Sequence, residues 1–167
     1  MTIDLGAFKH VVDHGIPIRK AAYHLLENIS DKFQFNQASV VDAAIASVVD
    51  PSEEVLAQVM LFLNKLWVLC PLIVTSKTDQ LVMGFINLYK ANKTNLSKNT
   101  NAQQAANQER SANLMKGPIR MTKIIQSNPE VAQNQLFQQW LNDAILNNAV
   151  APIMKDIYEK TNISVGV

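Results

Sequence analysis

Apolar residues recur at helical spacing in four stretches between Ile18 and Leu88. Residues three or four apart lie on the same side of an α-helix, so each stretch predicts an amphipathic helix with one buried face. No stretch after Val12 shows the alternation of apolar and polar residues that is typical of a half-buried strand. The predicted buried positions are Ile18, Ala22, Leu25, Leu26 and Ile29; Val41, Ala44, Ile45 and Val48; Leu56, Met60, Leu63 and Trp67; and Leu81, Phe85 and Leu88.

Prolines mark where the helices begin. Proline is favoured in the first turn of a helix because the N–H that it lacks would have no partner there. The sequence Asp50-Pro51-Ser52-Glu53 predicts the clearest start, with Asp50 as the cap, proline next and a glutamate three residues after the cap. Five of the six prolines stand at predicted helix starts: Pro17, Pro51, Pro71, Pro129 and Pro152.

Helix starts near Pro17, Gln37, Pro51 and Pro71 predict antiparallel helix pairs joined by short loops. The step from Pro17 to Pro51 is 34 residues, which fits repeat proteins with periods of about 34 to 47 residues. No tetratricopeptide consensus is present. We therefore predict an all-α, HEAT-like α-solenoid of stacked antiparallel helix pairs, with a short N-terminal strand left from a hairpin.

The sequence predicts a single domain that has five parts. We predict a hairpin remnant and turn over 1–15, two helix pairs over 16–90, a polar loop over 91–102, terminal helices over 103–160 and a tail over 161–167. The dipeptide Gly117-Pro118 predicts a break or kink. The last two helices are expected at Val131–Asn147 and Val150–Lys160, burying Leu136, Phe137 and Trp140.

Composition limits the classes of protein to consider. The chain has 167 residues, of which 48% are hydrophobic and 17% charged, enough for one domain with its own core. It lacks a long apolar run and the layout of a signal peptide, so we expect a soluble, intracellular protein without a membrane partner. The lone cysteine, Cys70, lies in the apolar run "LWVLCP", which favours a buried, inert thiol over a reactive one.

Charge is unevenly distributed along the chain. Residues 80–129 hold seven bases and one acid, although the whole chain has a net charge of +1. A basic segment can bind nucleic acid, but only Phe85 and Tyr89 lie nearby to stack on bases. Solvated helix faces are the favoured interpretation, and nucleic acid is the alternative.

Catalytic and metal-binding motifs are absent from the sequence. His10 and His14 are four residues apart, which suits a metal only on a helix, and His14 adjoins Gly15 in a predicted turn. His24 lies beside the apolar stripe of the first helix. No nucleophile elbow, phosphate loop or paired-cysteine motif occurs, and five glycines form no cluster. We therefore expect no enzyme activity, cofactor, metal or small-molecule substrate.

The stretch "DLGAFKHVVDHGIPIRKAAY" resembles the segment that opens the C-terminal domain of the cullin-associated, neddylation-dissociated proteins, which reads much like GPFKHTVDDGLDIRKAAF. The resemblance continues at "LWVLCP", at Asp79, Leu81 and Val82, and at Arg110-Ser111-Ala112, and departs at His14, Pro17 and Met83-Gly84. The ungapped matches in the first stretch are Phe8, Lys9, His10, Val12, Asp13, Gly15, Ile18, Arg19, Lys20, Ala21 and Ala22.

The resemblance implies a protein-interaction module in the cytoplasm and nucleus. These proteins are HEAT-repeat arcs that wrap around unneddylated cullin-RING ubiquitin ligases and act as exchange factors for substrate-receptor modules. Their C-terminal repeats bind the cullin's N-terminal helical region and compete with the receptor adaptor. The partner-binding residues that the resemblance implies are Phe8, Lys9, His10, Val12, Asp13, Arg19 and Lys20.

A projecting hairpin in the family collides with the adaptor, and residues 8–12 resemble its second strand. We expect the first strand to lie upstream, so that the chain is a piece of a larger solenoid. Phe8 is the predicted anchor, and the alternative is that it covers Ile18 and Leu25 as a lid. A HEAT scaffold for another protein partner and a nucleic-acid or acidic-ligand binder remain the alternative functions.

Overall fold

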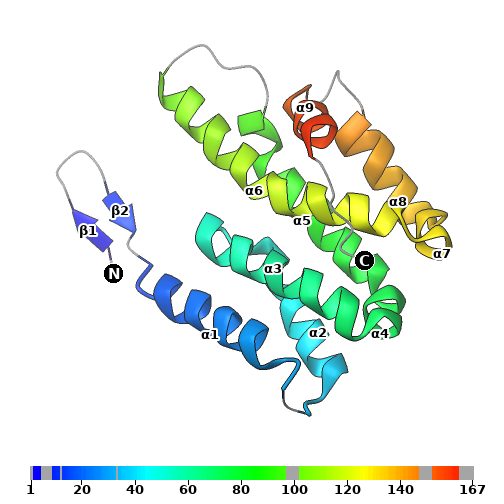
Figure 1. Ribbon diagram of the computed structural model, residues 1–167. Coiled ribbons are helices and arrows are strands. Elements are labelled where there is room, and N and C mark those ends of the chain that lie inside the picture. The colour runs from blue at the N-terminus through cyan, green and yellow to red at the C-terminus, as the bar shows by residue number, and fades with distance from the viewer. Residues whose placement is uncertain are drawn as a thin grey trace.

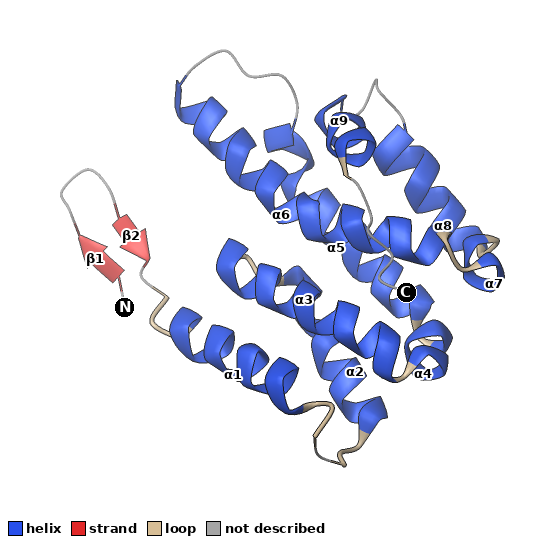
Figure 2. Ribbon diagram, in the orientation of Figure 1, coloured by secondary structure: helices blue, strands red, loops and turns tan. Residues whose placement is uncertain are grey.

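Helices make up most of the structure (Figures 1 and 2). The computed structural model describes residues 13–32, 34–96, 102–146 and 152–161, and the backbone of residues 2–4 and 9–11. A 3₁₀ turn, Ser47–Val49, follows α2, and a π-helical segment, Leu141–Leu146, follows α8. The helices are α1 (Ile16–Ile29), α2 (Gln37–Ala46), α3 (Glu53–Leu69), α4 (Pro71–Ser76), α5 (Thr78–Leu96), α6 (Ala102–Gln126), α7 (Pro129–Ala132), α8 (Gln135–Trp140) and α9 (Pro152–Lys160).

Seven of the described helices stack in two layers. In one layer α1 packs on α3, α3 on α6 and α6 on α9; in the other α2 packs on α5 and α5 on α8. Contacts of α2 with α3 and of α5 with α6 join the layers. Figure 1 shows α1, α3, α6 and α9 following one another across the molecule. The predicted all-α, HEAT-like stacking of antiparallel helices is confirmed.

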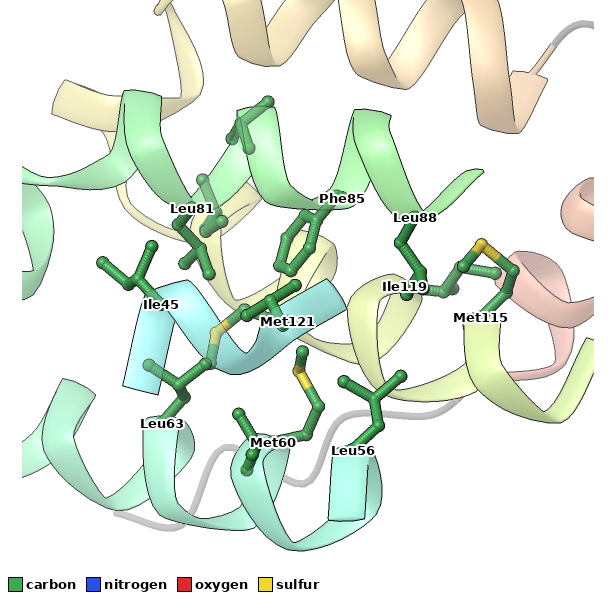
Figure 3. Packing of buried hydrophobic residues seen from close by; sticks show 14 of the residues in the cluster. Ile45, Leu56, Met60, Leu63, Leu81, Phe85, Leu88, Met115, Ile119 and Met121 are labelled. Atoms are coloured by element: carbon green, nitrogen blue, oxygen red, sulfur yellow. The ribbon is translucent and has the colours of Figure 1, made fainter. Parts of the chain in front are cut away.

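The hydrophobic core lies between the two layers. Figure 3 shows Leu56, Met60 and Leu63 of α3 facing Leu81, Phe85 and Leu88 of α5, with Ile45 of α2 and Met115, Ile119 and Met121 of α6 beside them. All of these side chains are buried. The apolar positions predicted for α2, α3 and α5 therefore form the core, with Trp67 partly buried at its margin.

The buried face predicted for α1 is wrong at Ile18, Ala22 and Leu25, whereas Leu26 and Ile29 are partly buried. The side chains of Ile18 and Leu25 are 73% and 58% exposed, and Ala22 is also exposed. The helix lies at the edge of its layer and packs mainly on α3, through Ile16, Tyr23 and Leu26. Tyr23 contacts Phe62, with 6.2 Å between ring centroids. Helical spacing identified an apolar stripe on α1. Because α1 lies at the edge of its layer, it has a neighbouring helix on one side alone, and the rest of the stripe remains exposed.

A short antiparallel hairpin precedes α1 (Figure 2). Strand β1 (Thr2–Asp4) pairs with β2 (Lys9–Val11), with Ile3 opposite His10. The expectation that the partner of the second strand lies upstream is wrong, because both strands belong to this chain. The overlooked signal is the pair of β-branched residues Thr2 and Ile3, which favour extended backbone.

Helix α6 runs through Gly117-Pro118 without the predicted break. A Cβ at position 117 would lie 2.5 Å from Cγ of Met60, so glycine allows close approach of α6 to α3 at this point. Pro118 is buried, and its carbonyl accepts a hydrogen bond from the Thr122 hydroxyl at 2.8 Å. Packing against α3 and this side-chain bond offset the backbone hydrogen bond that proline cannot make.

Three other boundaries differ from the prediction. Helix α5 continues to the buried Leu96, so residues 91–96 are helical, and α6 begins at Ala102. The helix expected at Val131–Asn147 is divided at Asn134, whose side chain caps α8 by accepting from the Phe137 N–H at 3.0 Å. Phe137 and Trp140 are buried as predicted, and Leu136 is partly buried. Asn147 and Val150 lie outside the described residues.

The cap of α3 is Ser52 and not Asp50. The Ser52 hydroxyl accepts from the Val55 N–H, while the Asp50 carboxylate accepts from the Ser52 N–H at 2.9 Å. Asp50 therefore orders the loop before α3 and remains available to a second partner. Across the described helices, no segment is long and apolar enough to cross a membrane.

Candidate functional site

The structure describes three of the predicted partner-binding residues at the start of α1, and it joins two of them, Asp13 and Arg19. Asp13 lies in the turn between the hairpin and α1, and Arg19 and Lys20 follow in the first turns of that helix. Lys9 and His10 belong to β2, where the backbone alone is described. Phe8 and Val12 lie outside the described residues, so the prediction for these two side chains stays a prediction.

Arg19 joins the turn before α1 to the loop before α3. Its guanidinium donates to the Asp13 carboxylate, with Nη2 2.8 Å from Oδ2, and to the Asp50 carboxylate, with Nε 2.8 Å from Oδ2. Asp13 also accepts from the Gly15 N–H at 2.8 Å. The planar guanidinium can hold two carboxylates at fixed geometry, which an ammonium group cannot do as well. Arg19 therefore fixes the turn that carries the hairpin relative to α1 and α3.

Hydrogen bonds favour the ionised forms of Asp13 and Arg19. The hydrogen bond from Arg19, and then that from the Gly15 N–H, lower the pKa of the Asp13 carboxyl below its usual range. Hydrogen bonds to Asp13 and then to Asp50 raise the pKa of Arg19 above its already high value. The Asp13–Arg19 pair is partly exposed, so its role is geometric more than a large source of stability.

Lys20 forms a separate pair with Glu54 of α3. Its Nζ lies 2.7 Å from Oε2 of Glu54, and both side chains are exposed. The hydrogen bond from Lys20 lowers the pKa of the Glu54 carboxyl. A solvent-exposed pair of this kind exchanges partners at little cost. Lys20 is thus accessible to a docking protein, whereas Arg19 is held by two carboxylates.

Sequence reasoning missed Asp50 as a member of this cluster. It lies 31 residues after Arg19, and its pattern with Pro51 and Glu53 pointed to a helix cap. Its side chain is 10% exposed, which makes it the most buried carboxylate in the cluster. The sequence around Asp50 could indicate a carboxylate near the start of a helix, but it could not indicate that Arg19 would pair with it.

The described residues offer little for metal or thiol chemistry. Within ranges 13–32, 34–96, 102–146 and 152–161, no group of three or more His, Cys, Asp or Glu side chains could hold a metal ion. Burial raises the pKa of Cys70, and its Sγ donates to the Leu66 carbonyl oxygen at 3.3 Å.

The two-layer stack of helices places the protein in the class of helical-repeat proteins. A model of the TIP120 family, described as TATA-binding protein interacting (TIP20), matches residues 1–144. The chain therefore belongs to this family.

One curated relative is "Cullin-associated NEDD8-dissociated protein 1" of Arabidopsis thaliana. The chain is 35% identical to it over 83 residues, which cover 48% of the chain and 7% of that protein. The chain thus matches a small part of the length of this relative. No solved structure is significantly similar to the chain.

Proposed function

We propose that the chain binds the N-terminal helical region of unneddylated cullins and helps to regulate the assembly and exchange of substrate-receptor modules on cullin-RING ubiquitin ligases. The family match over residues 1–144 is the observation that carries the proposal, and the name of the Arabidopsis relative supports it. The proposed role is non-catalytic, competes with the receptor adaptor and operates in the cytoplasm and nucleus.

The proposed contact surface is the hairpin and the turn that follows it. Phe8, Lys9, His10, Val12 and Asp13 are its members. An apolar side chain on a projecting hairpin can anchor an interface, and a neighbouring lysine can orient docking. The cluster around Arg19 supports this proposal because it ties the turn that follows the hairpin to α1 and to the loop before α3.

Arg19 and Lys20 take different parts in this surface. Arg19 acts as a positioning residue, since its guanidinium is engaged by Asp13 and Asp50. Lys20 can contact the cullin directly after releasing the exposed Glu54. Replacing Arg19 should therefore weaken binding through disorder of the turn, and replacing Lys20 should chiefly slow association and change its salt dependence.

Calorimetric titration with a cullin, unmodified and neddylated, tests the proposed partner. We expect the unmodified cullin to bind and the neddylated form to bind much more weakly. Pre-loading the cullin with its receptor adaptor should reduce the apparent affinity. Equal binding of both forms would contradict the proposed preference, and no binding of the unmodified form would contradict the partner itself.

A Phe8→Ala variant separates an anchor from a lid. If Phe8 is an anchor, the variant should lose roughly 1–3 kcal/mol of binding free energy with little change in melting temperature. If Phe8 instead covers α1, stability should fall by a similar amount. Leu146→Ala is the matched control, because Leu146 is 41% exposed on the segment after α8, far from α1 in the stack. Unchanged affinity in Phe8→Ala would remove Phe8 from the site.

A further inference from the structure

A groove runs between α3 and α6 on the outer side of their layer. It encloses about 420 Å³ and is lined from one side by α3 and from the other by α6. Its lower part is apolar, with Leu56, Met60 and Leu114 buried beneath it. Gly117 lies on the α6 side, where any side chain would meet Met60. Glycine at this point lets α6 lie close to α3, because a Cβ would push the two helices apart.

An apolar side chain is exposed to solvent at the mouth of the groove. Leu61 lines it and is 47% exposed, and the neighbouring Ala57 is also exposed. An isolated exposed leucine is ordinary on a protein surface. Here Leu61 is continuous with the buried apolar side chains of the groove, so one bound apolar side chain could contact both. A continuous apolar surface of this kind is a feature of docking sites.

The α6 wall of the groove is basic. Lys116 and Arg120 are both exposed and line the groove, and neither has an acidic partner in the part of the chain that the structure describes. Lys116 donates to the neutral Asn113 amide oxygen at 2.8 Å. Bases around the other sides of α3 are paired: Lys20 with Glu54, Lys65 with Asp31 and Arg110 with Glu53. Glu53 lines the α3 side of the groove and pairs with Arg110 at 3.9 Å, so Lys116 and Arg120 have no ion-pair partner among the described residues.

We propose that this groove binds one amphipathic helix of a partner protein, with an acidic flank that faces Lys116 and Arg120 and an apolar side chain that packs on Leu61 and Met60. The α3 wall runs from Glu53 to Asn64, roughly 17 Å at 1.5 Å per residue, which suits about three turns of a helix. Helix-in-groove recognition uses apolar residues at helical spacing, and charge on the rim sets orientation. This inference is independent of the hairpin and of the cullin.

Two synthetic peptides of eighteen residues test the inference. One carries leucines at helical spacing flanked by glutamates, and the other has lysine in place of every glutamate. We expect the acidic peptide to bind the ¹⁵N-labelled chain with a dissociation constant in the micromolar range and to shift amide signals of α3 and α6 around Leu61 and Gly117. The lysine peptide should bind at least about tenfold more weakly. Equal affinity of the two peptides, or signal shifts confined to other helices, would overturn the proposal.

Reversing the charge of the two bases in the groove provides a second test of the proposal. Lys116→Glu combined with Arg120→Glu should weaken the acidic peptide about tenfold or more and should reverse the preference between the peptides. Lys90→Glu combined with Lys93→Glu is the matched control, because it makes the same change of charge on exposed side chains of α5. Melting curves of both variants check that folding is retained. Unchanged affinity in the first variant, or an equal loss in the control, would overturn the site.

Discussion

The indole N–H of Trp140 donates a hydrogen bond to the Thr122 hydroxyl oxygen, 2.9 Å away, between α8 and α6. Both side chains are almost completely buried. The same hydroxyl donates to the Pro118 carbonyl at 2.8 Å, so it acts as acceptor and donor at once. One threonine therefore satisfies a buried indole in α8 and reinforces the helical turn that contains the proline of α6.

Thr122→Val should destabilise the protein by about 1–3 kcal/mol. Valine has a similar volume but leaves the Trp140 N–H buried without a partner, and that desolvation cost is not recovered. Chemical denaturation followed by tryptophan fluorescence measures the change. Thr122→Ser is the matched control: it keeps the hydroxyl and should lose less than the valine variant. A valine variant as stable as the wild type would show that the hydrogen bond contributes nothing.

Gly117→Ala should destabilise the protein by about 1 kcal/mol. The new Cβ would lie 2.5 Å from Cγ of Met60 and 3.2 Å from its Cβ, and such overpacking costs about 1–3 kcal/mol. Alanine recovers up to about 1 kcal/mol through its higher helix propensity. Gly84→Ala provides a control in α5, because its Cβ would lie 3.3 Å from Val48 Cγ1; it should range from neutral to a gain of about 1 kcal/mol.

The cause of the Gly117 effect can be isolated by a double-mutant cycle. Met60→Ala alone should cost about 2–5 kcal/mol, since it removes a buried side chain. In that background the contact with Cγ is gone and the 3.2 Å contact with Cβ of residue 60 remains. Adding Gly117→Ala there should therefore range from neutral to a gain of up to about 1 kcal/mol. An equal loss of stability from Gly117→Ala in both backgrounds would show that contact with the Met60 side chain is not the cause.

Helical periodicity was enough to predict the core faces of α2, α3 and α5. These helices have neighbours in both layers, so an apolar stripe on any of them is buried. The same reasoning failed for α1, where Ile18 and Leu25 face away from α3. Periodicity shows that a stripe exists, whereas the identity of the covered side depends on the order in which helices stack. The break predicted at Gly117-Pro118 is absent for a related reason, because packing of α6 on α3 outweighs the local preference for a break.

Only those residues of the candidate site that are close together in the sequence could be predicted. Asp13, Arg19 and Lys20 are close in sequence, so they could be grouped before the fold was known. Asp50 could not join them, since its contact with Arg19 spans 31 residues and depends on how α1 packs on α3. Lys116 and Arg120 were recognised as bases in a basic segment, but the apolar groove beside them is formed by two helices far apart in sequence.

Cys70 should react slowly with Ellman's reagent in the native protein. Its side chain is buried, and burial raises the pKa of the thiol, so little of the reactive thiolate is present near neutral pH. In denaturant the same thiol should react at the rate of a free cysteine. The ratio of the two rates measures protection by the fold. Rapid labelling of the native protein would contradict the buried position of Cys70.

The acid sensitivity of the protein should depend partly on Asp13. Arg19 lowers the pKa of this carboxyl in the folded state below the value of 3.8 typical of the unfolded chain. A carboxyl with a lowered pKa stabilises the folded state above its unfolded pKa and loses that contribution as the pH falls through the folded value. Asp13→Asn should therefore be less stable than the wild type at pH 7, and the difference should shrink below about pH 4.

Urea denaturation at pH 7 and at pH values below about 4, together with NMR titration of the Asp13 carboxyl, measures this effect. Asp143→Asn is the matched control, because it removes the same charge from an exposed side chain with no ion pair to any described residue. Its effect on stability should depend much less on pH. Asp31 and Glu54 also have lowered pKa values, through Lys65 and Lys20, so the Asp13→Asn variant should keep part of the acid sensitivity. A pH-independent difference between Asp13→Asn and the wild type would contradict the role of the Arg19 hydrogen bond, since its contribution must vanish once Asp13 is protonated.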